Sequence, residues 1–516
     1  MPEYPDKWWR NAVIYEVYVR SFADGNGDGI GDLIGLRERL PHLADLGVDA
    51  IWLTPFFRSP MVDGGYDVSD YRDVDPSFGT LADFDAMLAA AHGLGLRVII
   101  DVVPNHTSSA HPWFAQALQA LPDDPARARY HFRPPAPDGG PPNDWESVFG
   151  GPAWTQVADG EWYLHLFDPA QPDLNWDNAD VRSEFESVLR FWLDRGVDGF
   201  RIDVAHGMVK ADGYPHAGTS GQIGLLGRRV LPYFDQDGVH EIHRAWRKIL
   251  DSYPGDRMAV AEAWASSPQR LARYTAPDEL HQAFNFEFLQ ADWADPAAVR
   301  AGIDSCIHAA ESVGAPTTWV LSNHDVRRHP TRLGSLARAN AAALLMLALP
   351  GSAYVYQGDE LGLPEVLDLP ADARQDPVWF RSGGTDPGRD GCRVPLPWTA
   401  AAPAHGFSAT GEAWLPQPDW SGLAADAQAA DPGSTLQLYR AALRLRRGLR
   451  GPLRWNDSPA GVLDFNRGDL RCVVNLSGDP VPLPAGEVVL AGGTIDRDTL
   501  PPNAAVWIFA RTAGSF

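Results

Sequence analysis

The stretch from Asp198 to His206, DGFRIDVAH, places an arginine and a carboxylate at the end of a short apolar run. Arg201 and Asp203 stand two residues apart, so both project from one face of a predicted strand. Burying Asp203 costs several kcal/mol unless a partner such as Arg201 compensates its charge. On its own the stretch favours a structural ion pair. Whether it belongs to a functional site depends on which other residues the chain places near it.

Other predicted strands also end in side chains that can move protons or bind polar groups. Barrels of parallel strands place their active sites at the carboxyl ends of the strands. Several such sets, spread over much of the chain, indicate an active site rather than a series of unrelated ion pairs. The sets are Asp101, Asn105 and His106 after the third predicted strand, Arg201 and Asp203 after the fourth, Glu262 after the fifth, and His324 and Asp325 after the seventh.

Alternating strand and helix signals predict the scaffold that positions these side chains. The predicted strands are 12–20, 49–55, 96–103, 199–203, 257–262, 283–286, 319–323 and 353–357, and the clearest helices are 33–46, 81–94, 181–195 and 435–449. Such alternation implies parallel strands joined by crossover helices. About eight strands fit an α/β fold of the (β/α)8 TIM-barrel type better than an open doubly wound sheet.

Two segments depart from this alternation. Residues 104–176 are rich in Pro, Gly, Asp and Trp and contain no long periodic segment. A structureless loop of that length is uncommon in a compact domain, so we expect an inserted subdomain after the third strand. Short alternating strands with turn signals predict a C-terminal antiparallel β domain at 453–516. The barrel would then comprise residues 1–103 and 177–452.

Composition narrows the class of function. A net charge of −24 argues against nucleic acid or anionic membranes as partners. The three cysteines, Cys306, Cys392 and Cys472, provide neither a disulfide framework nor a zinc pattern. We see no apolar core of a signal peptide and no apolar run long enough to span a membrane. We therefore expect a cytoplasmic enzyme that acts on a small substrate without an organic cofactor.

The loop from Asp24 to Asp32, DGNGDGIGD, presents oxygen ligands at every second position. A tight loop of this kind can wrap a hard cation. It is not an EF-hand, because the glutamate expected at the twelfth position is missing. A plain glycine-rich turn is the alternative interpretation.

Together these motifs resemble those of the α-amylase superfamily (glycoside hydrolase family 13), in its branch of α-glucosidases and oligo-1,6-glucosidases. The resemblance runs essentially end to end, and includes QPDLNW at 171–176 and YQGDEL at 356–361. It implies a retaining glycosidase with a TIM barrel that acts on small oligosaccharides as a monomer or homodimer. It also implies a structural Ca2+ (or Mg2+) held by Asp24, Asn26, Asp28, the Ile30 carbonyl and Asp32.

The resemblance also assigns catalytic roles. Asp203 would be the nucleophile and Glu262 the general acid and base, a pair that retaining enzymes hold roughly 5 Å apart. Asp325 would bind the ring hydroxyls and distort the sugar. Arg201 would orient Asp203 and keep it ionised. Hydrogen bonds that strengthen in the transition state would come from His106 and His324.

The pocket for the terminal glucose would contain two further motifs, GYD at 65–67 and GCR at 391–393. Tyr66 would be a stacking platform, and Asp67 would bind glucose hydroxyls. Arg393 would pair with Asp67 and close the end of the pocket, which dictates exo action. Arg389 is the alternative to Arg393 in this role, and either arginine could instead be a solvated surface residue.

Linkage specificity rests on the residues beside the nucleophile. Within the branch, valine at the position of Val204 correlates with α-1,6 cleavage. However, residues 205–207 and Val326 differ from the pattern of the α-1,6 enzymes. We therefore expect α-1,4 activity on maltose and short maltooligosaccharides, with some α-1,6 tolerance. An oligo-1,6-glucosidase, or a transglucosylase or glucosyl isomerase that uses the same residues, is the alternative.

Overall fold

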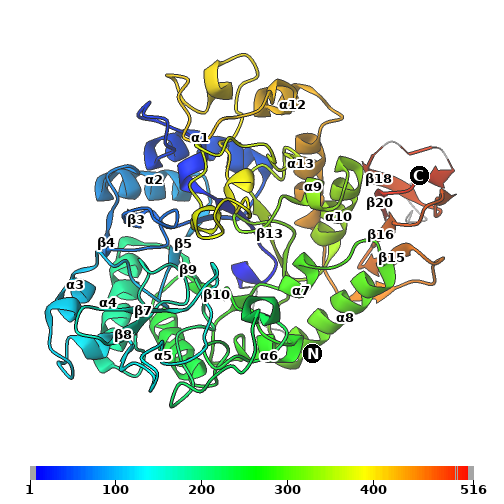
Figure 1. Ribbon diagram of the computed structural model, residues 1–516. Coiled ribbons are helices and arrows are strands. Elements are labelled where there is room, and N and C mark those ends of the chain that lie inside the picture. The colour runs from blue at the N-terminus through cyan, green and yellow to red at the C-terminus, as the bar shows by residue number, and fades with distance from the viewer. Residues whose placement is uncertain (1–6, 494, 497, 510–516) are drawn as a thin grey trace.

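The computed structural model describes residues 7–493, 495–496 and 498–509 (Figure 1). Its central element is a parallel sheet of eight strands in the order β11-β10-β9-β5-β2-β1-β13-β12. A parallel bridge from Phe284, after β11, to Thr318 of β12 brings the two edges together, so the sheet forms a nearly closed barrel. The barrel strands are β1 (Val13–Val17), β2 (Ala50–Leu53), β5 (Arg97–Val102), β9 (Gly199–Ile202), β10 (Met258–Ala261), β11 (Gln282–Ala283), β12 (Thr318–Val320) and β13 (Ser352–Tyr356).

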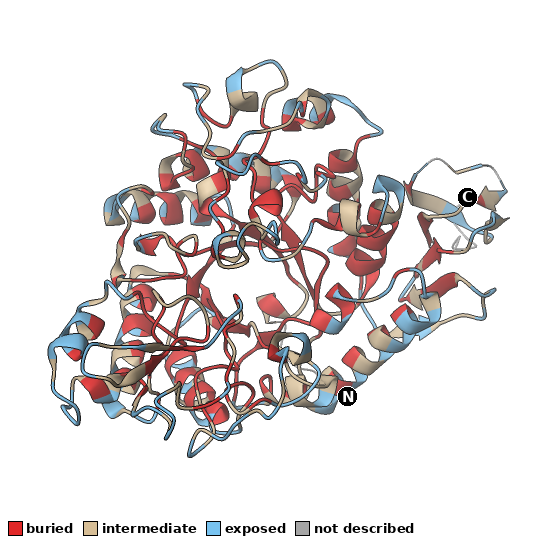
Figure 2. Cartoon of the chain, viewed as in Figure 1, coloured by how far each residue is buried: buried red, intermediate tan, exposed pale blue. Residues whose placement is uncertain are grey.

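Helices surround the barrel, and buried residues gather in the strands and on the helix faces turned toward them (Figure 2). The longer helices are α1 (Leu33–Leu46), α2 (Leu81–Gly93), α4 (Ala179–Arg195), α5 (Val239–Asp251), α8 (Pro296–Ser312), α10 (Leu336–Ala348) and α13 (Thr435–Arg446). The shorter ones are α3 (Pro112–Gln119), α6 (Pro268–Arg273), α7 (Phe286–Leu289), α9 (His329–Arg332), α11 (Pro377–Arg381) and α12 (Ala425–Ala430). No helix in the described part of the chain has both the length and the apolar character needed to cross a bilayer.

Local chemistry explains where the first helix begins and ends. The Asp32 side chain accepts the Gly35 N–H and caps the start of α1. Gly47 ends the helix with a left-handed φ of 97°, a conformation that glycine adopts without penalty. The predicted helix 33–46 therefore matches the structure residue for residue.

The segment between β5 and α4 contains α3 and a small antiparallel sheet, β6-β8-β7. Its strands are β6 (Phe132–Arg133), β7 (Trp154–Gln156) and β8 (Trp162–Leu164). The buried Lys210 ties this segment to the barrel, because its ammonium contacts Asp173 at 2.7 Å and the Asn105 side chain at 3.0 Å. Asn105, a predicted strand-end residue, thus belongs to a structural network. A second small sheet follows β2 and pairs β3 (Phe57–Arg58) with β4 (Asp70–Val74).

The chain ends in antiparallel sheets at the right of Figure 1, as expected. The larger sheet has the order β14-β15-β16-β20-β18. The strands are β14 (Leu453–Trp455), β15 (Val462–Arg467), β16 (Leu470–Asn475), β17 (Val481–Pro482), β18 (Glu487–Gly492), β19 (Thr499–Leu500) and β20 (Ala504–Phe509). The buried Trp507 donates to the Leu344 carbonyl of α10, and both residues belong to the main hydrophobic core.

Candidate active site

Arg201 lies at the centre of the carboxyl end of the barrel. The register of β5 with β9 places Asp101 beside Arg201, and the guanidinium donates to Asp101 at 2.9 Å. The same guanidinium donates to Asp203 at 2.6 Å and lies 3.5 Å from Glu262. One buried cation therefore contacts carboxylates delivered by three adjacent strands.

Asp203 is buried, and burial raises the pKa of its carboxyl well above the usual value. Arg201 opposes that shift, whereas Glu262 adds to it. The next residue, Val204, has a left-handed φ of 43°, which is strained for a β-branched side chain. In this conformation the Val204 N–H donates to Glu262 Oε2 at 2.7 Å. Backbone strain thus coincides with a hydrogen bond from the residue after Asp203 to Glu262.

Glu262 has a second hydrogen bond that the sequence analysis missed. The indole N–H of Trp264 donates to Glu262 Oε1 at 2.8 Å. The Trp264 ring stacks on Phe286 with centroids 4.1 Å apart, which holds the indole in place. Trp264 and Glu262 both lie beyond the end of β10 at Ala261, so strand alternation does not predict this contact.

Asp325 sits between two arginines. Arg389 and Arg393 each donate to Asp325 Oδ1 at 3.0 Å. Burial raises the pKa of Asp325, but His324 and the two guanidinium groups outweigh burial and hold that pKa well below its usual value. His324 is itself buried and bonds through Nδ1 to Glu16 of β1, a polar residue in an apolar strand that the sequence analysis did not single out.

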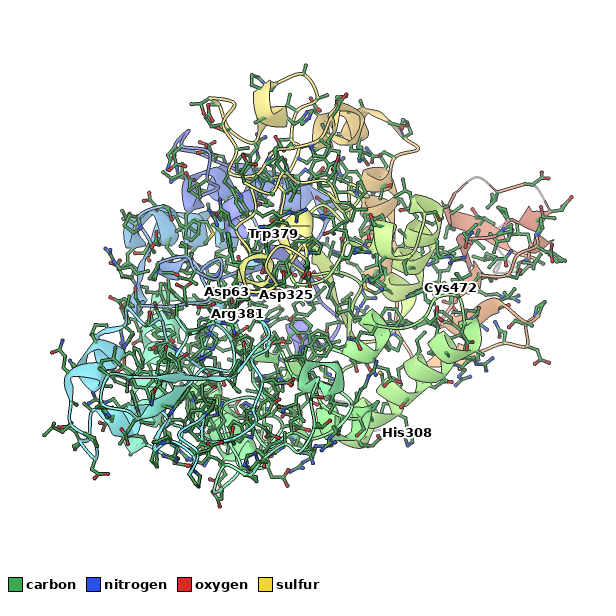
Figure 3. All side chains as sticks on the ribbon, in the orientation of Figure 1. Asp63, His308, Asp325, Trp379, Arg381 and Cys472 are labelled. Atoms are coloured by element: carbon green, nitrogen blue, oxygen red, sulfur yellow. The ribbon has the colours of Figure 1, made fainter. Side chains whose placement is uncertain are left out.

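The predicted pair of Asp67 with Arg393 is wrong. Asp67 is fully buried and accepts hydrogen bonds from Ser59 Oγ and from the backbone N–H groups of Val62 and Asp63. Asp63 takes the place expected for Asp67: it contacts Arg389 at 2.6 Å, and Figure 3 shows it beside Asp325. The reason is the tight turn through Gly64 and Gly65, both at positive φ, which turns Asp67 back onto its own loop.

Tyr66 and His106 lie where the sequence predicts, at the pocket. The Tyr66 ring stacks on His324 with centroids 5.3 Å apart, and its hydroxyl donates to Asp101 at 3.0 Å. His106 Nε2 lies 3.1 Å from the Tyr66 carbonyl. Burial lowers the pKa of His106 to about 4, so the ring is neutral at pH 7.

These elements enclose a cavity of about 250 Å³. Its polar lining consists of Asp63, Tyr66, His106, Asp203, His206, Glu262, Asn323, Asp325 and Arg389, and its apolar wall includes Phe149, Phe167, Phe234, Trp264 and Phe286. Of the predicted substrate-binding residues, Asp67, Arg201, His324 and Arg393 stand behind this lining and support it. The arrangement combines paired carboxylates with a mixed polar and aromatic wall, which suits cleavage of a sugar.

The loop at 24–32 carries oxygen donors of the type that a hard cation prefers. In the structure these donors bind the loop itself: Asp24 accepts the N–H groups of Asn26, Gly27 and Gly29, Asp28 accepts that of Ile30, and Asp32 accepts those of Gly25, Asn26 and Gly35. Among the described residues, three His, Cys, Asp or Glu ligands converge only at His240, His243 and Glu279. The donor chemistry therefore fits a Ca2+ site, although the three aspartates do not converge.

A family model for the alpha amylase catalytic domain matches residues 16–450 of this chain. The chain belongs to the α-amylase family. A second model, a domain of unknown function (DUF3459), matches residues 456–507, which cover most of the C-terminal sheets. Membership in the α-amylase family, together with relatives named as glucosidases, identifies the protein as a glycoside hydrolase.

Similar proteins place the chain within the α-amylase family. A probable alpha-glucosidase of Rhizobium meliloti (strain 1021) is 40% identical over 92% of this chain and 90% of its own length. An oligo-1,6-glucosidase of Parageobacillus thermoglucosidasius is 37% identical over 85% of this chain and 84% of its own. The crystal structure of an alpha-glucosyl transfer enzyme has a TM-score of 0.88 and 39% identity, and covers 98% of this chain and 100% of that one. The relatives thus include both hydrolases and a transferase.

Proposed function

We propose that the protein is an exo-acting, retaining α-glucosidase that releases α-glucose from the non-reducing ends of short α-glucosides. Maltose and maltooligosaccharides would be its preferred substrates. The observation that carries the proposal is the single guanidinium of Arg201 in contact with both Asp203 and Glu262. This shared contact supports the separation of roughly 5 Å that retaining enzymes use.

In the first step, the Asp203 carboxylate attacks the anomeric carbon. The glycosidic bond breaks, and Glu262 gives its proton to the departing oxygen. Arg201 keeps Asp203 oriented, and Asp325, held ionised by Arg389 and Arg393, binds the ring hydroxyls. The product of this step is a covalent glucosyl ester on Asp203 and a released alcohol.

In the second step, Glu262 takes a proton from water, and the water oxygen attacks the anomeric carbon. The ester bond breaks, which frees α-glucose and returns Asp203 as a carboxylate. The hydrogen bonds from Trp264 and Val204 leave Glu262 in one orientation for both proton transfers.

Exo action is supported by the cluster around Arg389. Its guanidinium contacts Asp63 at 2.6 Å, Asp376 at 2.7 Å and Asp325 at 3.0 Å. These contacts join three segments across one side of the cavity, where a continuing sugar chain would have to pass. Only a terminal glucose would then fit between this cluster and Asp203.

Glucosyl transfer is the second candidate function. The wall formed by Phe149, Phe234, Trp264 and Phe286 offers apolar surface to an acceptor and disfavours bound water. An acceptor hydroxyl would then replace water in the second step, with Asp203 and Glu262 in unchanged roles. The similar alpha-glucosyl transfer enzyme supports this alternative.

Product analysis over time tests these proposals, with maltose, isomaltose, sucrose and trehalose given separately. Glucose released chiefly from maltose is the expected result. Faster release from isomaltose would assign the protein to the α-1,6 enzymes. New oligosaccharides or isomeric disaccharides in place of free glucose would make it a transferase.

Val204 offers a direct test of linkage preference, because its side chain lines the cavity next to Asp203. Val204→Thr exchanges one methyl for a hydroxyl, so we expect a change of about 1–3 kcal/mol at most in the ratio of kcat/KM for maltose and isomaltose. The ratio should shift toward maltose. An unchanged ratio would remove Val204 from the determinants of specificity.

We also propose that the loop at 24–32 binds a structural Ca2+, or Mg2+ in its place. Asp24, Asn26, Asp28, the Ile30 carbonyl and Asp32 would hold the ion. Bound there, it would brace the segment between β1 and α1, because Asp32 also caps α1. No catalytic step depends on it.

A further inference from the structure

A second cavity, of about 520 Å³, lies at the opposite end of the barrel from the candidate active site. Part of its wall comes from residues at the amino ends of three barrel strands, near Val13 of β1, Asp49 before β2 and Arg97 of β5. The end of α13 and the connection to β14 form the opposite wall. None of the candidate catalytic residues lines this cavity.

The charge of this cavity is opposite to that of the whole chain. Its lining contains a single acid, Asp49, whereas the net charge of the protein is −24. Its basic lining residues are Lys7, Arg10, Arg97, Arg446, Arg447, Arg450 and Arg467. We name this feature the basic cavity.

Two of the arginines in the basic cavity, Arg446 and Arg467, are buried and donate to several backbone carbonyls. Arg446 donates to the carbonyls of Leu347, Leu349 and Gly351, and Arg467 donates to those of Ala348 and Leu349. Within the described part of the chain, neither forms an ion pair, and neither Nε atom has a hydrogen-bond partner. Carbonyls at the end of α10 carry only partial charge, so they do not neutralise two guanidinium groups.

The arginines also repel one another. Burial and the charge of Arg467 lower the pKa of Arg446 to about 9. Burial and the charge of Arg450 lower the pKa of Arg467 to about 10. Asp49 opposes the lowering at Arg446, but it is one carboxyl among several guanidinium groups, and burial raises its own pKa. A group with two negative charges in the basic cavity would reverse this repulsion.

Two exposed arginines stand at the edge of the basic cavity and can reach an incoming ligand. Arg447 donates to the Gly47 carbonyl, and Arg450 donates to the carbonyls of Arg447 and Leu449. In the described structure neither contacts a carboxylate. Arg447 and Arg450 do not bind the carbonyls at the end of α10, so capping of that helix does not explain why they are there.

We propose that the basic cavity is a binding site for a phosphate group, carried either by inorganic phosphate or by a small phosphate monoester. Guanidinium groups suit this ligand, because their paired N–H donors match phosphate oxygens in a bidentate manner. The volume leaves room for an organic body, and the exposed Leu94 and the half-buried Trp8 line the cavity beside the charges. Binding would stabilise the folded protein and connect the barrel to the segment that leads into β14.

Thermal unfolding of the full chain tests this proposal. The probes are sodium phosphate and glucose 1-phosphate, each compared with sodium chloride at equal ionic strength and constant pH. We expect phosphate to raise Tm in a saturable manner, which general salt screening does not do. A response to both probes would show that the phosphate group suffices, and a response to glucose 1-phosphate alone would assign the site to monoesters. No saturable response to either probe would overturn the proposal.

A double variant locates the effect. Arg447→Gln with Arg450→Gln removes two charges from the edge of the basic cavity and leaves the buried pair Arg446 and Arg467 in place. We expect an unchanged Tm in chloride and an apparent Kd for the effective probe that rises at least about tenfold. Arg444→Gln is the control for loss of a nearby exposed arginine, because Arg444 lies on α13 but does not line the cavity. Equal responses in the double variant and the control would contradict the assignment.

Discussion

Arg201 serves several carboxylates at once, and this explains why a lysine could not replace it. Its planar guanidinium reaches Asp101, Asp203 and Glu262 from one position, whereas an ammonium is a single point of charge. Because the group is buried, its loss would leave these acids without their shared partner. The charge state of Asp203, the proposed nucleophile, therefore depends on the whole cluster.

The indole N–H of Trp264 positions Glu262, and Trp264→Phe isolates this contribution. The variant keeps an aromatic ring against Phe286 but removes the hydrogen bond to Glu262 Oε1. We expect kcat for maltose to fall by about 10- to 100-fold with little change in KM, because orientation matters most in the transition state. Trp414→Phe is the control, since its N–H donates to Ser21, which does not line the pocket. A matching loss in the control, or no loss in Trp264→Phe, would contradict this role.

Asp67 gives the pH dependence of stability a definite sign. Burial raises the pKa of Asp67 to about 6, so the folded state holds this proton more tightly than the unfolded chain does. Its stabilising contribution is present at low pH and is lost as pH rises through 6. Relative to Asp67→Asn, the free energy of unfolding of the wild type should therefore fall by about 1 kcal/mol between pH 5 and pH 7. Urea titrations at both values check this, and a difference that rises with pH would contradict it.

Which side chains reach the pocket followed largely from their positions at strand ends. Strand period and strand direction are local properties, so Asp203, Glu262 and Asp325 could be placed at the pocket without coordinates. The partners of Arg389 and Arg393 could not be predicted in the same way. The pairing of Arg389 depends on the turn through Gly64 and Gly65, both at positive φ. This turn leaves Asp63 beside Arg389 and directs Asp67 onto its own loop.

At the scale of elements, prediction was best where local chemistry sets the boundary. The cap at Asp32 and the left-handed Gly47 fix both ends of α1. By contrast, α13 ends at Arg446, three residues before the predicted end, where the Arg446 side chain binds carbonyls at the end of α10. The end of α13 therefore depends on contacts with a distant part of the chain, and hydrophobic periodicity cannot predict such contacts.

The loop before α1 can be tested by removing its ion. If the loop binds Ca2+, saturating calcium should add about 2.7 kcal/mol to the free energy of unfolding at 100 times Kd, and chelation should remove it. Asp28→Ala should abolish this calcium effect with little cost in chelator. Asp32→Ala should lose about 1 kcal/mol even in chelator, because it also removes the cap of α1. Equal stability of the wild type with and without calcium would refute the metal site.

At the scale of the whole molecule, the C-terminal sheets share one core with the barrel. Trp507 of β20 is buried against α10, and Leu344, Phe465 and Trp507 all lie in the main hydrophobic cluster. The two ends of the barrel carry different features, with the candidate active site at the carboxyl ends of the strands and the basic cavity at the amino ends. Because the two features lie at separate ends, a substitution in the basic cavity can leave the candidate active site unaltered.

The shared core predicts that the C-terminal sheets stabilise the catalytic barrel. Trp507→Ala should cost about 3–5 kcal/mol, because it leaves a large cavity and removes the hydrogen bond to Leu344. Loss of activity and loss of secondary structure should then shift together to lower denaturant concentration. Activity that persists at the wild-type midpoint would show that the sheets fold independently of the barrel.

The central claim, that Asp203 forms a glucosyl ester which water then opens, predicts the anomer of the product. The most direct measurement is proton NMR of maltose hydrolysis in its first minutes, before mutarotation mixes the anomers of glucose. Two successive inversions at the anomeric carbon should release glucose from the non-reducing end first as the α anomer. Initial accumulation of β-glucose beyond the amount that the reducing-end residue of maltose contributes would mean a single inversion by water, and would contradict the role of Asp203 as nucleophile.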